Sequence, residues 1–438
     1  MKDIKNVNVL GVGLGPSNLS LASIIQDRGL ISQNFSCLFI DSKEKFEWHT
    51  GMLIPGMSLQ VPFFRDLITT HNPKSQFTFL NYLKAQNRLD QFINLRTFYP
   101  TRTEFYDYLK WVYEQIKHLT EFGCEVLDIE PVFDNNKNII KLKVNYLDHK
   151  MDTKFSVLTN NIILSIGAEP NIPNKYNDQR ILHTANLLTK VPVNFPEKDG
   201  KYSFVVVGSG QSAGESVFYL MQNYPNSKIS WCFRNVTLHS TDNSPLVNKL
   251  YHGNSIDPFY NLNNLERKKV HEDLQNSNYS VVDVELLNDI FKMQYLESLD
   301  GKNRLQLCPR YDFKEATPNQ KYIATKFFDH ILGKSITKKS DSLILATGYN
   351  KQKYTHLLKQ LDGYLIKTTD NEYVINRNYS IQTNQKLKAN IYLQGYCEKT
   401  HGPSDSTLAI LPHRSNIILN SIIGIKNTVK KPVKQFYM

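Results

Sequence analysis

The sequence has little cysteine, and no two cysteines are spaced as a redox pair or a zinc site requires. Its five cysteines, an odd number, are scattered through 438 residues and form no Cys-x-x-Cys motif. Cys37 and Cys232 lie in apolar runs, where a free cysteine behaves as a small hydrophobic residue. This usage argues against a disulfide framework and favours a reducing, cytoplasmic location.

Long apolar runs and metal-ligand patterns of histidine are also absent. No stretch approaches the roughly 18 apolar residues of a membrane-spanning helix, so the sequence predicts none and no membrane partner. The opening MKDIKNVNVLGVG predicts a strand and a turn rather than a signal peptide. The twelve histidines show no His-Glu-x-x-His or comparable spacing, so we expect no protein-bound metal.

The charge is basic but not concentrated. The net charge is +11, yet the lysines are spread out and cluster only in short pairs such as Lys338-Lys339. A nucleic-acid binder would show a basic patch or stripe, so we expect no nucleic-acid partner and a solvated surface that attracts phosphorylated cofactors. The length itself predicts two or three domains.

The first chemical motif is a strand that runs into a glycine turn and a helix. NVNVLG ends at Gly11, Gly13 and Gly15 follow, and Pro16 opens a helical pattern. Such a turn lets the backbone approach a pyrophosphate, and the helix N-terminus favours its negative charge. The next strand, CLFID, ends at Asp41, which is placed to bind a ribose hydroxyl.

The motif repeats near the middle of the chain. The run SFVVVGSGQSAGE predicts a strand, a turn at Gly208 and Gly210, and a helix that contains Ala213 and Gly214. The following strand, KISWCF, is succeeded by Arg234 instead of an acid. An acid there selects a free ribose hydroxyl, whereas an arginine accommodates a 2′-phosphate, so the first site suits FAD and the second NADPH. The alternative is that Arg234 is an ordinary exposed cation.

Two further strands indicate how the units are connected. NIILSIGAEPNIP and SLILATGYN are β-rich runs that end in glycine turns, like the crossover strands of flavoproteins that bind two dinucleotides. We therefore expect an α/β fold with two Rossmann-like domains and a small helical substrate-binding subdomain. The expected parts are an FAD domain over 1–200, an NADPH domain over 201–340 with the helical segment at about 240–330, and a return to the FAD domain over 341–438.

Several longer motifs resemble one family. From about residue 7 to about 423 the chain is similar to the flavin-dependent N-hydroxylating monooxygenases, which hydroxylate the side-chain amine of ornithine or lysine, or a related amine, for siderophore biosynthesis. The resemblance rests on GVGLGPSNL, FEWHTGM, LQVPFFRDLITTHNP, FLNYL, GSGQSAGE, DNSPLVNKLY, NSNYSVVD, ATGY and THGPSDSTL. Baeyer–Villiger and sulfide monooxygenases share the nucleotide motifs alone and remain a remote alternative. A flavin disulfide reductase would need a cysteine pair that the chain lacks.

The resemblance implies a role for particular residues. FAD would contact Gly11, Gly13, Gly15, Pro16, Asp41, Trp48, His49 and Gln60, and NADPH would contact Gly208, Gly210, Ser212 and Arg234. Further cofactor contacts would come from Thr347, Gly348, Ser404 and Asp405, the last two in a turn before a helix over 406–423. The substrate would contact Arg65, Asn248 and Asn278, with Gln60 and Asn278 positioning the reacting groups. From the residues alone, Trp48 is equally consistent with packing, and the asparagines with capping.

The implied chemistry requires no catalytic side chain. NADPH would reduce FAD and stay bound as NADP⁺, O₂ would give a C4a-hydroperoxyflavin, and the neutral substrate amine would attack it. The protein would exclude water and position the amine. Because the free amine has a pKa of about 10.4, we expect hydroxylation to speed up from neutral to mildly alkaline pH. Relatives include assemblies of several subunits, so the resemblance favours a homo-oligomer.

The identity of the amine depends on Arg65, which is a departure from the family pattern. Amino-acid-hydroxylating relatives have lysine there to pair with the substrate carboxylate, and Lys249 and Pro403 also depart, from glutamate and leucine. Arginine can bind a carboxylate through a bidentate fork. We rank an ornithine-type amine first, then a decarboxylated amine (putrescine, cadaverine or histamine), for which Arg65 would fold onto Asp66, and lysine third.

Overall fold

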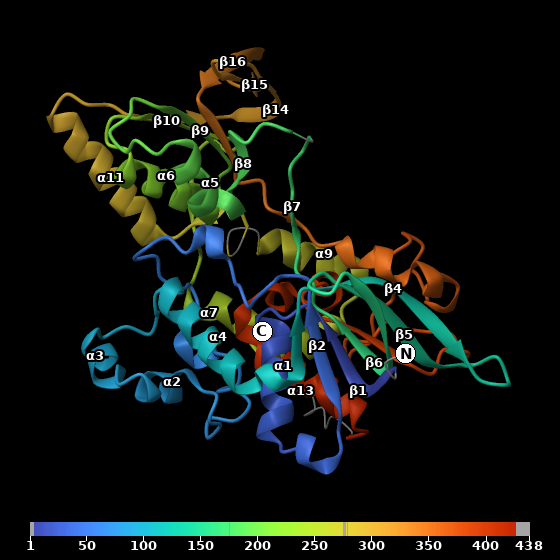
Figure 1. Ribbon diagram of the computed structural model, residues 1–438. Helices are drawn as coiled ribbons and strands as arrows, with labels where there is room; N and C mark the ends of the chain where they lie inside the picture. The colour runs from blue at the N-terminus through green and yellow to red at the C-terminus, as the bar shows by residue number, and fades with distance from the viewer. Residues whose placement is uncertain (1–3, 175, 275–276, 278, 426–438) are drawn as a thin grey trace.

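The computed structural model describes residues 4–174, 176–274, 277 and 279–425. Figure 1 shows two lobes, each built around a sheet, with a small antiparallel sheet at the far end of the second lobe. Both main sheets carry helices, so the α/β class with two Rossmann-like units is confirmed. The domain boundaries given above stay predictions.

The first sheet has the order β3-β2-β1-β6-β5-β4, and β19 pairs with β6. Its parallel part contains β1 (Lys5–Val12), β2 (Cys37–Asp41), β3 (Thr120–Phe122), β6 (Thr153–Leu164) and β19 (Asn390–Leu393). An antiparallel extension adds β5 (Ile139–Asp148) and β4 (Cys124–Phe133). The covering helices include α1 (Pro16–Asp27), α4 (Arg102–Ile116) and α13 (Leu411–Ile422), and α1 packs against the other two. We call this assembly, with the small helices α2 (Phe79–Ala85) and α3 (Leu89–Asn94), the first unit.

The second sheet is wholly parallel, in the order β13-β10-β9-β17-β8. Its strands are β8 (Ile181–His183), β9 (Ser203–Val207), β10 (Lys228–Phe233), β13 (Leu305–Pro309) and β17 (Ser342–Leu345). With α5 (Leu187–Asn194), α6 (Gln211–Asn223) and α11 (Val284–Leu299) they form the second unit. All four residues of β17 are buried, as expected for a parallel strand covered on both faces.

The stretch from 240 to 330 differs from the expected helical segment. Helices α7 (Pro245–Asn248), α8 (Ile256–Tyr260) and α9 (Asn264–Asp273) are short, and β11 (His239–Ser240) pairs with β12 (Val281–Val282). After α11 the chain forms strands, and β14 (Tyr311–Pro318), β15 (Ile323–Asp329) and β16 (Lys334–Ser340) make the antiparallel sheet. Buried and open positions largely alternate along β15, which is the pattern of a strand with one solvated face.

The short helices of this segment dock on the first unit. Helix α8 contacts α12 (Glu398–His401), and the Tyr260 hydroxyl donates to the Ile375 carbonyl at 3.0 Å. Gly253 lies so close to the His413 ring that an added Cβ would be 2.6 Å from Nδ1. The segment therefore bridges from the second unit to the first, where the two units meet.

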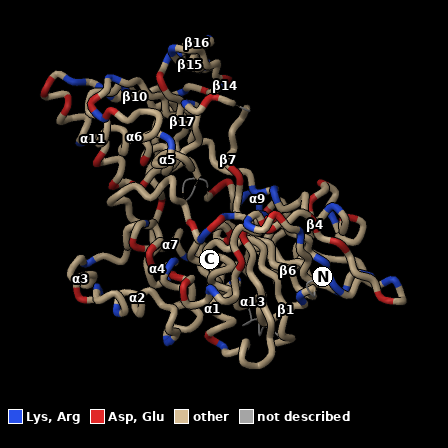
Figure 2. The backbone as a smooth tube through the Cα atoms, viewed as in Figure 1, with Lys and Arg blue, Asp and Glu red and all other residues tan. Residues whose placement is uncertain are grey.

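The two crossovers between the units lie side by side. β7 (Glu169–Pro170) leaves the first unit, β18 (Tyr349–Asn350) returns to it, and the two pair antiparallel. Figure 2 shows lysines and arginines interspersed with acidic residues over both lobes. Across the residues the structure describes, we find no helix with the length and apolar character to cross a membrane.

Candidate cofactor and substrate site

The first glycine turn is built for close backbone contact on one side and is open on the other. Gly13 has φ +84°, and a Cβ there would lie 2.4 Å from the Ser165 carbonyl oxygen. A Cβ on Gly15, in contrast, would meet no atom within 4 Å. Gly15 is also the N-cap of α1, without a side-chain cap, and Pro16 follows in the first turn. The start of α1 therefore has no side-chain cap and has open space beside Gly15, which suits the binding of an anion.

Asp41 and Asn18 hold this turn in shape. Asp41 ends β2, and its carboxylate accepts from the backbone N–H of Leu14 at 2.7 Å and of Lys43 at 2.9 Å. Asn18 donates to the Gly13 carbonyl at 2.7 Å from the buried face of α1. Each Asp41 oxygen keeps a lone pair for a further donor, so the carboxylate can still bind a ribose hydroxyl.

The second glycine turn repeats the arrangement with a different residue at its rim. Gly208 has φ +136°, and a Cβ there would lie 2.6 Å from the Ala346 carbonyl oxygen. Gly210 is the N-cap of α6, again without a side-chain cap, and Ser212 is in the first turn. Arg234 directly follows β10, is exposed, and forms no hydrogen bond or ion pair with a described residue. The turn and this free cation fit a dinucleotide that carries a 2′-phosphate.

Trp48 and His49 lie together beside the first unit's helix α4. The Trp48 ring contacts His49 and Phe105 edge-to-face, with centroids 5.0 and 5.8 Å apart. His49 has a left-handed φ of 49° and keeps part of its surface in solvent. The protein atoms packed around it, followed by the charges of Arg102 and Lys43, lower the pKa of His49 to about 4. The imidazole is therefore neutral at pH 7.

Gln60 is exposed, and its amide forms no hydrogen bond with a described residue. The segment before it is fixed, because Leu59 N–H donates to the Pro100 carbonyl at 2.9 Å and Ser58 bridges to Thr101. Gln60 is thus presented on an anchored loop with its donors and acceptor free.

The adjacent charges Arg65 and Asp66 do not pair with each other. Asp66 is 1% exposed, and its carboxylate accepts from Ile68 N–H at 2.9 Å and from the N–H groups of Thr69 and Phe79 at 2.7 Å. The Thr69 hydroxyl donates to it as well, at 2.7 Å. Asp66 is therefore a structural acid that ties its loop to the start of α2, and the alternative in which Arg65 folds onto it is wrong.

Arg65 is half-buried, and none of the described acidic residues pairs with it. Its guanidinium forms no hydrogen bond or ion pair with a described residue, and burial lowers its pKa, against the influence of Tyr99. It acts on His252, whose pKa is lowered by burial and then by Arg65 and Lys249. The charge of Arg65 is therefore close enough to the segment that follows α7 to act on His252.

Three segments that carry predicted substrate and cofactor residues meet at this point. The 3₁₀ turn Phe63–Arg65 contacts the turn Leu408–Ile410, and the turn Lys249–Tyr251 after α7 contacts the turn Pro403–Ser406. Asn248, the last residue of α7, donates to the Asn243 carbonyl at 2.8 Å, which fixes its amide and leaves its oxygen free to accept. Asn278 lies outside the described residues. The capping role considered for it belongs to Asp283, which accepts from Glu285 N–H at 2.9 Å at the start of α11.

Ser404 and Asp405 are buried, at 1% exposure each. Asp405 accepts from Cys397 N–H and from the Arg414 guanidinium, both at 2.7 Å, and Arg414 also donates to the Ser17 hydroxyl at 2.8 Å. Asp405 thus positions Arg414 against the first turn of α1. No motif pointed to Arg414, which stood out only by its place in the expected last helix.

The helix expected over 406–423 begins later, at Leu411. Thr407 is extended and Pro412 occupies the first turn of α13, so the helix starts where proline is favoured. The HGPSD segment itself runs into the 3₁₀ turn Pro403–Ser406, and a second 3₁₀ turn, Leu408–Ile410, follows before the helix begins.

Thr347 and Gly348 lie at the returning crossover. The Thr347 hydroxyl donates to the Asn171 carbonyl, and the Gly348 carbonyl accepts from Asn171 N–H at 2.9 Å and lies 3.0 Å from His183 Nε2. These contacts join the two crossover segments where they pass between the units.

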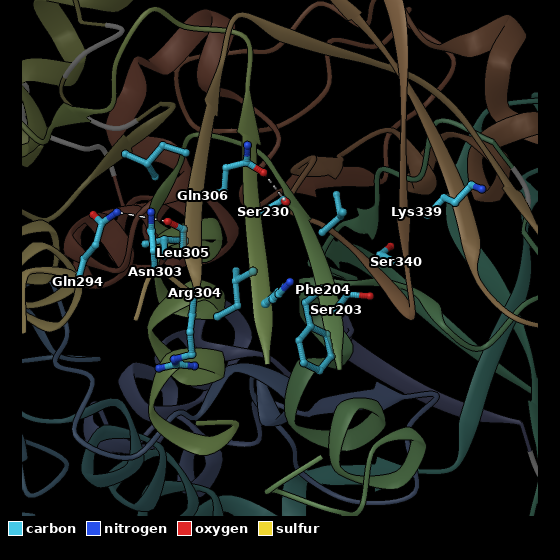
Figure 3. Close-up of a pocket in the computed structure, with 14 residues that line it drawn as sticks. Ser203, Phe204, Ser230, Gln294, Asn303, Arg304, Leu305, Gln306, Lys339 and Ser340 are labelled. Carbon is cyan, nitrogen blue, oxygen red and sulfur yellow. Dashed lines mark hydrogen bonds between the residues drawn. The ribbon is translucent and has the colours of Figure 1, made fainter. Parts of the chain in front are cut away.

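Two cavities lie away from these residues. The cavity in Figure 3, of about 590 Å³, lies at the amino ends of β9, β10 and β13, beside Ser203, Lys228 and Leu305. The glycine turn of the second unit is at the opposite, carboxyl ends of the same strands. A second cavity of about 960 Å³ lies beside Thr120, Tyr146 and Phe155 of the first sheet. Neither contains a residue predicted to bind cofactor or substrate.

The comparisons with known proteins agree with the motifs. The model of the family L-lysine 6-monooxygenase/L-ornithine 5-monooxygenase matches residues 5–351. The L-ornithine N(5)-monooxygenase of Pseudomonas aeruginosa is 34% identical over 421 residues, which cover 95% of this chain and 93% of that protein. The L-ornithine N(5)-monooxygenase of Aspergillus oryzae is 31% identical over 449 residues, covering 95% and 88%.

Solved structures agree as well. The ornithine hydroxylase of Pseudomonas aeruginosa superposes with a TM-score of 0.89 at 32% identity, covering 96% of this chain and 99% of that chain. The ornithine N-hydroxylase of Kutzneria sp. 744, solved with reduced FAD, NADP⁺ and L-ornithine, gives 0.91 at 29% identity, covering 96% and 100%. The chain therefore belongs to the L-lysine 6-monooxygenase/L-ornithine 5-monooxygenase family of N-hydroxylating flavoproteins, as its motifs indicated.

Proposed function

We propose that this protein catalyses the FAD- and NADPH-dependent N-hydroxylation of the side-chain amine of L-ornithine, for the biosynthesis of a hydroxamate siderophore. The choice of substrate rests on Arg65. This half-buried cation has no anionic partner among the described residues and lies where three segments of the site meet. A partly desolvated cation is stabilised when an anion binds beside it, and the α-carboxylate of an amino acid is such an anion. The relatives named above are ornithine enzymes.

Each unit has a role in this proposal. The open side of the first turn, at Gly15 and Pro16, would hold the FAD pyrophosphate, and Asp41 its ribose. The second turn and Arg234 would hold NADPH. Bound FAD supplies the redox and oxygen chemistry. The chain's part is to orient the amine through Arg65 and the free oxygen of Asn248, and to exclude water.

The decarboxylated amines are less well supported. For putrescine, cadaverine or histamine the carboxylate anchor is unnecessary, and Arg65 was expected to rest on Asp66. The Asp66 oxygens are instead occupied by backbone N–H groups and Thr69. L-Lysine keeps the carboxylate and stays the third candidate.

A cytoplasmic location is supported by the state of the cysteines. Cys37, Cys124, Cys232, Cys308 and Cys397 are all free thiols, as a reducing compartment maintains them. The homo-oligomer favoured by the resemblance remains a prediction.

The test of the reaction is an amine panel scored for NADPH-dependent hydroxylamine formation. We expect product with ornithine first, with lysine and the diamines weaker. Formation of no hydroxylamine from any primary amine would reject the proposal. Oxidation of a ketone or a thioether instead would point to the Baeyer–Villiger or sulfide class.

The test of the substrate is Arg65→Ala. Loss of a charge-assisted pair with a carboxylate costs roughly 2 kcal/mol, so KM for ornithine should rise about 30-fold. KM for putrescine should stay unchanged, because that amine has no carboxylate. Arg96→Ala is the matched control, since Arg96 is an exposed arginine on the same part of the first unit. Equal losses for ornithine and putrescine would show that Arg65 does not bind the carboxylate.

A further inference from the structure

A buried ion pair joins the two units directly. Arg102 is the first residue of α4 in the first unit, and Glu215 lies in α6 of the second. The guanidinium donates to both carboxylate oxygens, Nη1 to Oε2 at 2.6 Å and Nη2 to Oε1 at 2.5 Å. The Glu215 side chain is fully buried, and that of Arg102 is 17% exposed. This is a bidentate pair in a desolvated setting, where geometry is held most strictly.

On the second unit, the pair continues to the nucleotide turn. Glu215 Oε1 also accepts from Gln211 Nε2 at 2.8 Å, and Gln211 Oε1 accepts from Asp283 N–H at 2.8 Å. Gln211 is the first residue of α6, directly after the turn at Gly208 and Gly210. Asp283 follows β12, at the end of the segment that bridges the units. One network of hydrogen bonds thus fixes the start of α6 and the end of the bridging segment.

On the first unit, Arg102 is tied to the loop that leads to Gln60. Its backbone N–H donates to the Met57 carbonyl at 2.8 Å, and Ser58 bridges to the preceding residue, Thr101. The same guanidinium contributes to the lowered pKa of His49. Arg102 therefore stands between the residues expected at the flavin and the helix expected at the nicotinamide cofactor.

The energetics indicate what such a pair contributes. Removing two charges from water costs about as much as their attraction returns, so a buried pair adds little stability over an apolar contact. The ion pair instead fixes the relative position of the two side chains, which an apolar contact does less strictly. Two units that are joined by short crossovers need such a contact, because interfaces between domains otherwise allow motion.

We propose that Arg102 and Glu215 are positioning residues that set the nucleotide turn of the second unit against the flavin-facing loop of the first. The inference rests on the proposed function, because it assigns the pair to hydride transfer from NADPH to FAD. Breaking the pair leaves both cofactor sites intact but misaligned. Reduction of the flavin and retention of NADP⁺ then suffer while FAD stays bound.

The first test is Glu215→Gln, which keeps the size of the side chain and removes its charge. On FAD-loaded enzyme without amine or oxygen, we expect NADPH to reduce the flavin roughly 10- to 100-fold more slowly, the loss that a misplaced donor causes. In air, the yield of hydroxylamine per NADPH should fall and that of peroxide should rise. Arg102→Lys keeps the charge without the fork and should give an intermediate rate.

The matched control is Glu297→Gln. Glu297 pairs with Arg304 inside the second unit, also largely buried, with 16% and 12% of the side chains exposed. Its loss should lower stability without slowing flavin reduction. A merely structural role for Glu215 would give the same result as this control, with flavin content and thermal stability reduced and the rate per bound flavin unchanged.

The second test needs no cofactor. Hydrogen–deuterium exchange of the apo-protein should speed up in Glu215→Gln both at 57–60 in the first unit and at 211–215 in the second, and at neither in Glu297→Gln. Exchange that rises in the second unit alone, or flavin reduction within about twofold of the wild-type rate, would overturn the proposal. If the wild-type flavin is reduced by NADPH but no amine is hydroxylated, the proposed function fails and the positioning role stands.

Discussion

The two glycine turns share a backbone design and differ in the residue that we propose selects the nucleotide. In each turn, one glycine lies directly against the residue that follows a neighbouring strand. Gly13 lies against Ser165, which follows β6, and Gly208 lies against Ala346, which follows β17. At the end of the second strand, however, Asp41 is held by two backbone N–H groups, whereas Arg234 is exposed and unattached to described residues.

The difference separates a cofactor that stays from one that must exchange. A specificity group that is already fixed loses little freedom on binding, which favours tight retention. An exposed arginine must be ordered by the incoming phosphate and releases it more readily. The first site is thus suited to a resident FAD and the second to NADPH, which enters and leaves in each turnover.

The largest effect on stability and flavin binding is expected at the feature that the two turns share, the glycine in close contact with a neighbouring carbonyl. Gly13→Ala places a Cβ 2.4 Å from the Ser165 carbonyl at a φ of +84°, and the two faults together should cost about 3 kcal/mol or more. We expect the variant to be purified without flavin or to fail to fold. Gly15→Ala is the matched control because its Cβ enters open space, so apo-protein stability should not change. Flavin absorbance and thermal unfolding measure both. A flavin-loaded Gly13→Ala protein of normal stability would contradict the geometry.

The next effect concerns the residue in which the turns differ. Arg234→Ala removes the cation expected at the 2′-phosphate, at a cost of roughly 2–3 kcal/mol, so kcat/KM for NADPH should fall about 30- to 160-fold. NADH lacks that phosphate, and its kcat/KM should stay unchanged. Lys228→Ala serves as control, since Lys228 is an exposed cation at the other end of the same strand. Equal losses with both nucleotides would mean that Arg234 supports the strand and does not read the phosphate.

The turns could be predicted from sequence because their chemistry is local. Glycine spacing, an apolar strand before it and a helix after it are consecutive in the chain, and CLFID and KISWCF match β2 and β10 residue for residue. The crossover runs were recognisable for the same reason. In each run, the residue directly after the strand, Ser165 or Ala346, lies against a glycine turn.

Contacts between distant segments were not predictable. The pairing of Arg102 with Glu215 joins residues 113 positions apart, and a motif that ends in glutamate does not reveal its partner. Arg65 and Asp66 are adjacent in sequence and suggested a pair, but the carboxylate is taken by N–H groups of a loop and of α2. The strands β14 to β16 were missed because a helical reading was extended past Leu299 into a region of alternating burial. In each case the contact partner or the secondary structure depends on tertiary contacts, which a local sequence pattern does not specify.

The smallest effect is the acid sensitivity that two buried histidines give the first unit. Burial lowers the pKa of His401 and of His413 to about 4, and both lie on the first unit's returning segment. An unfolded histidine titrates near 6.5, so each neutral ring contributes stability that is complete above that pH and is lost as the pH falls toward 4. Between pH 7.5 and 5.5 the loss should be about 1 kcal/mol per ring.

Urea unfolding at these two pH values measures the drop in stability in the wild type and in His401→Gln. In His401→Gln the drop should shrink by about 1 kcal/mol, because glutamine does not titrate and can still donate to the Arg377 carbonyl that His401 contacts at 3.1 Å. An unchanged drop in the variant would mean that other groups carry the acid sensitivity.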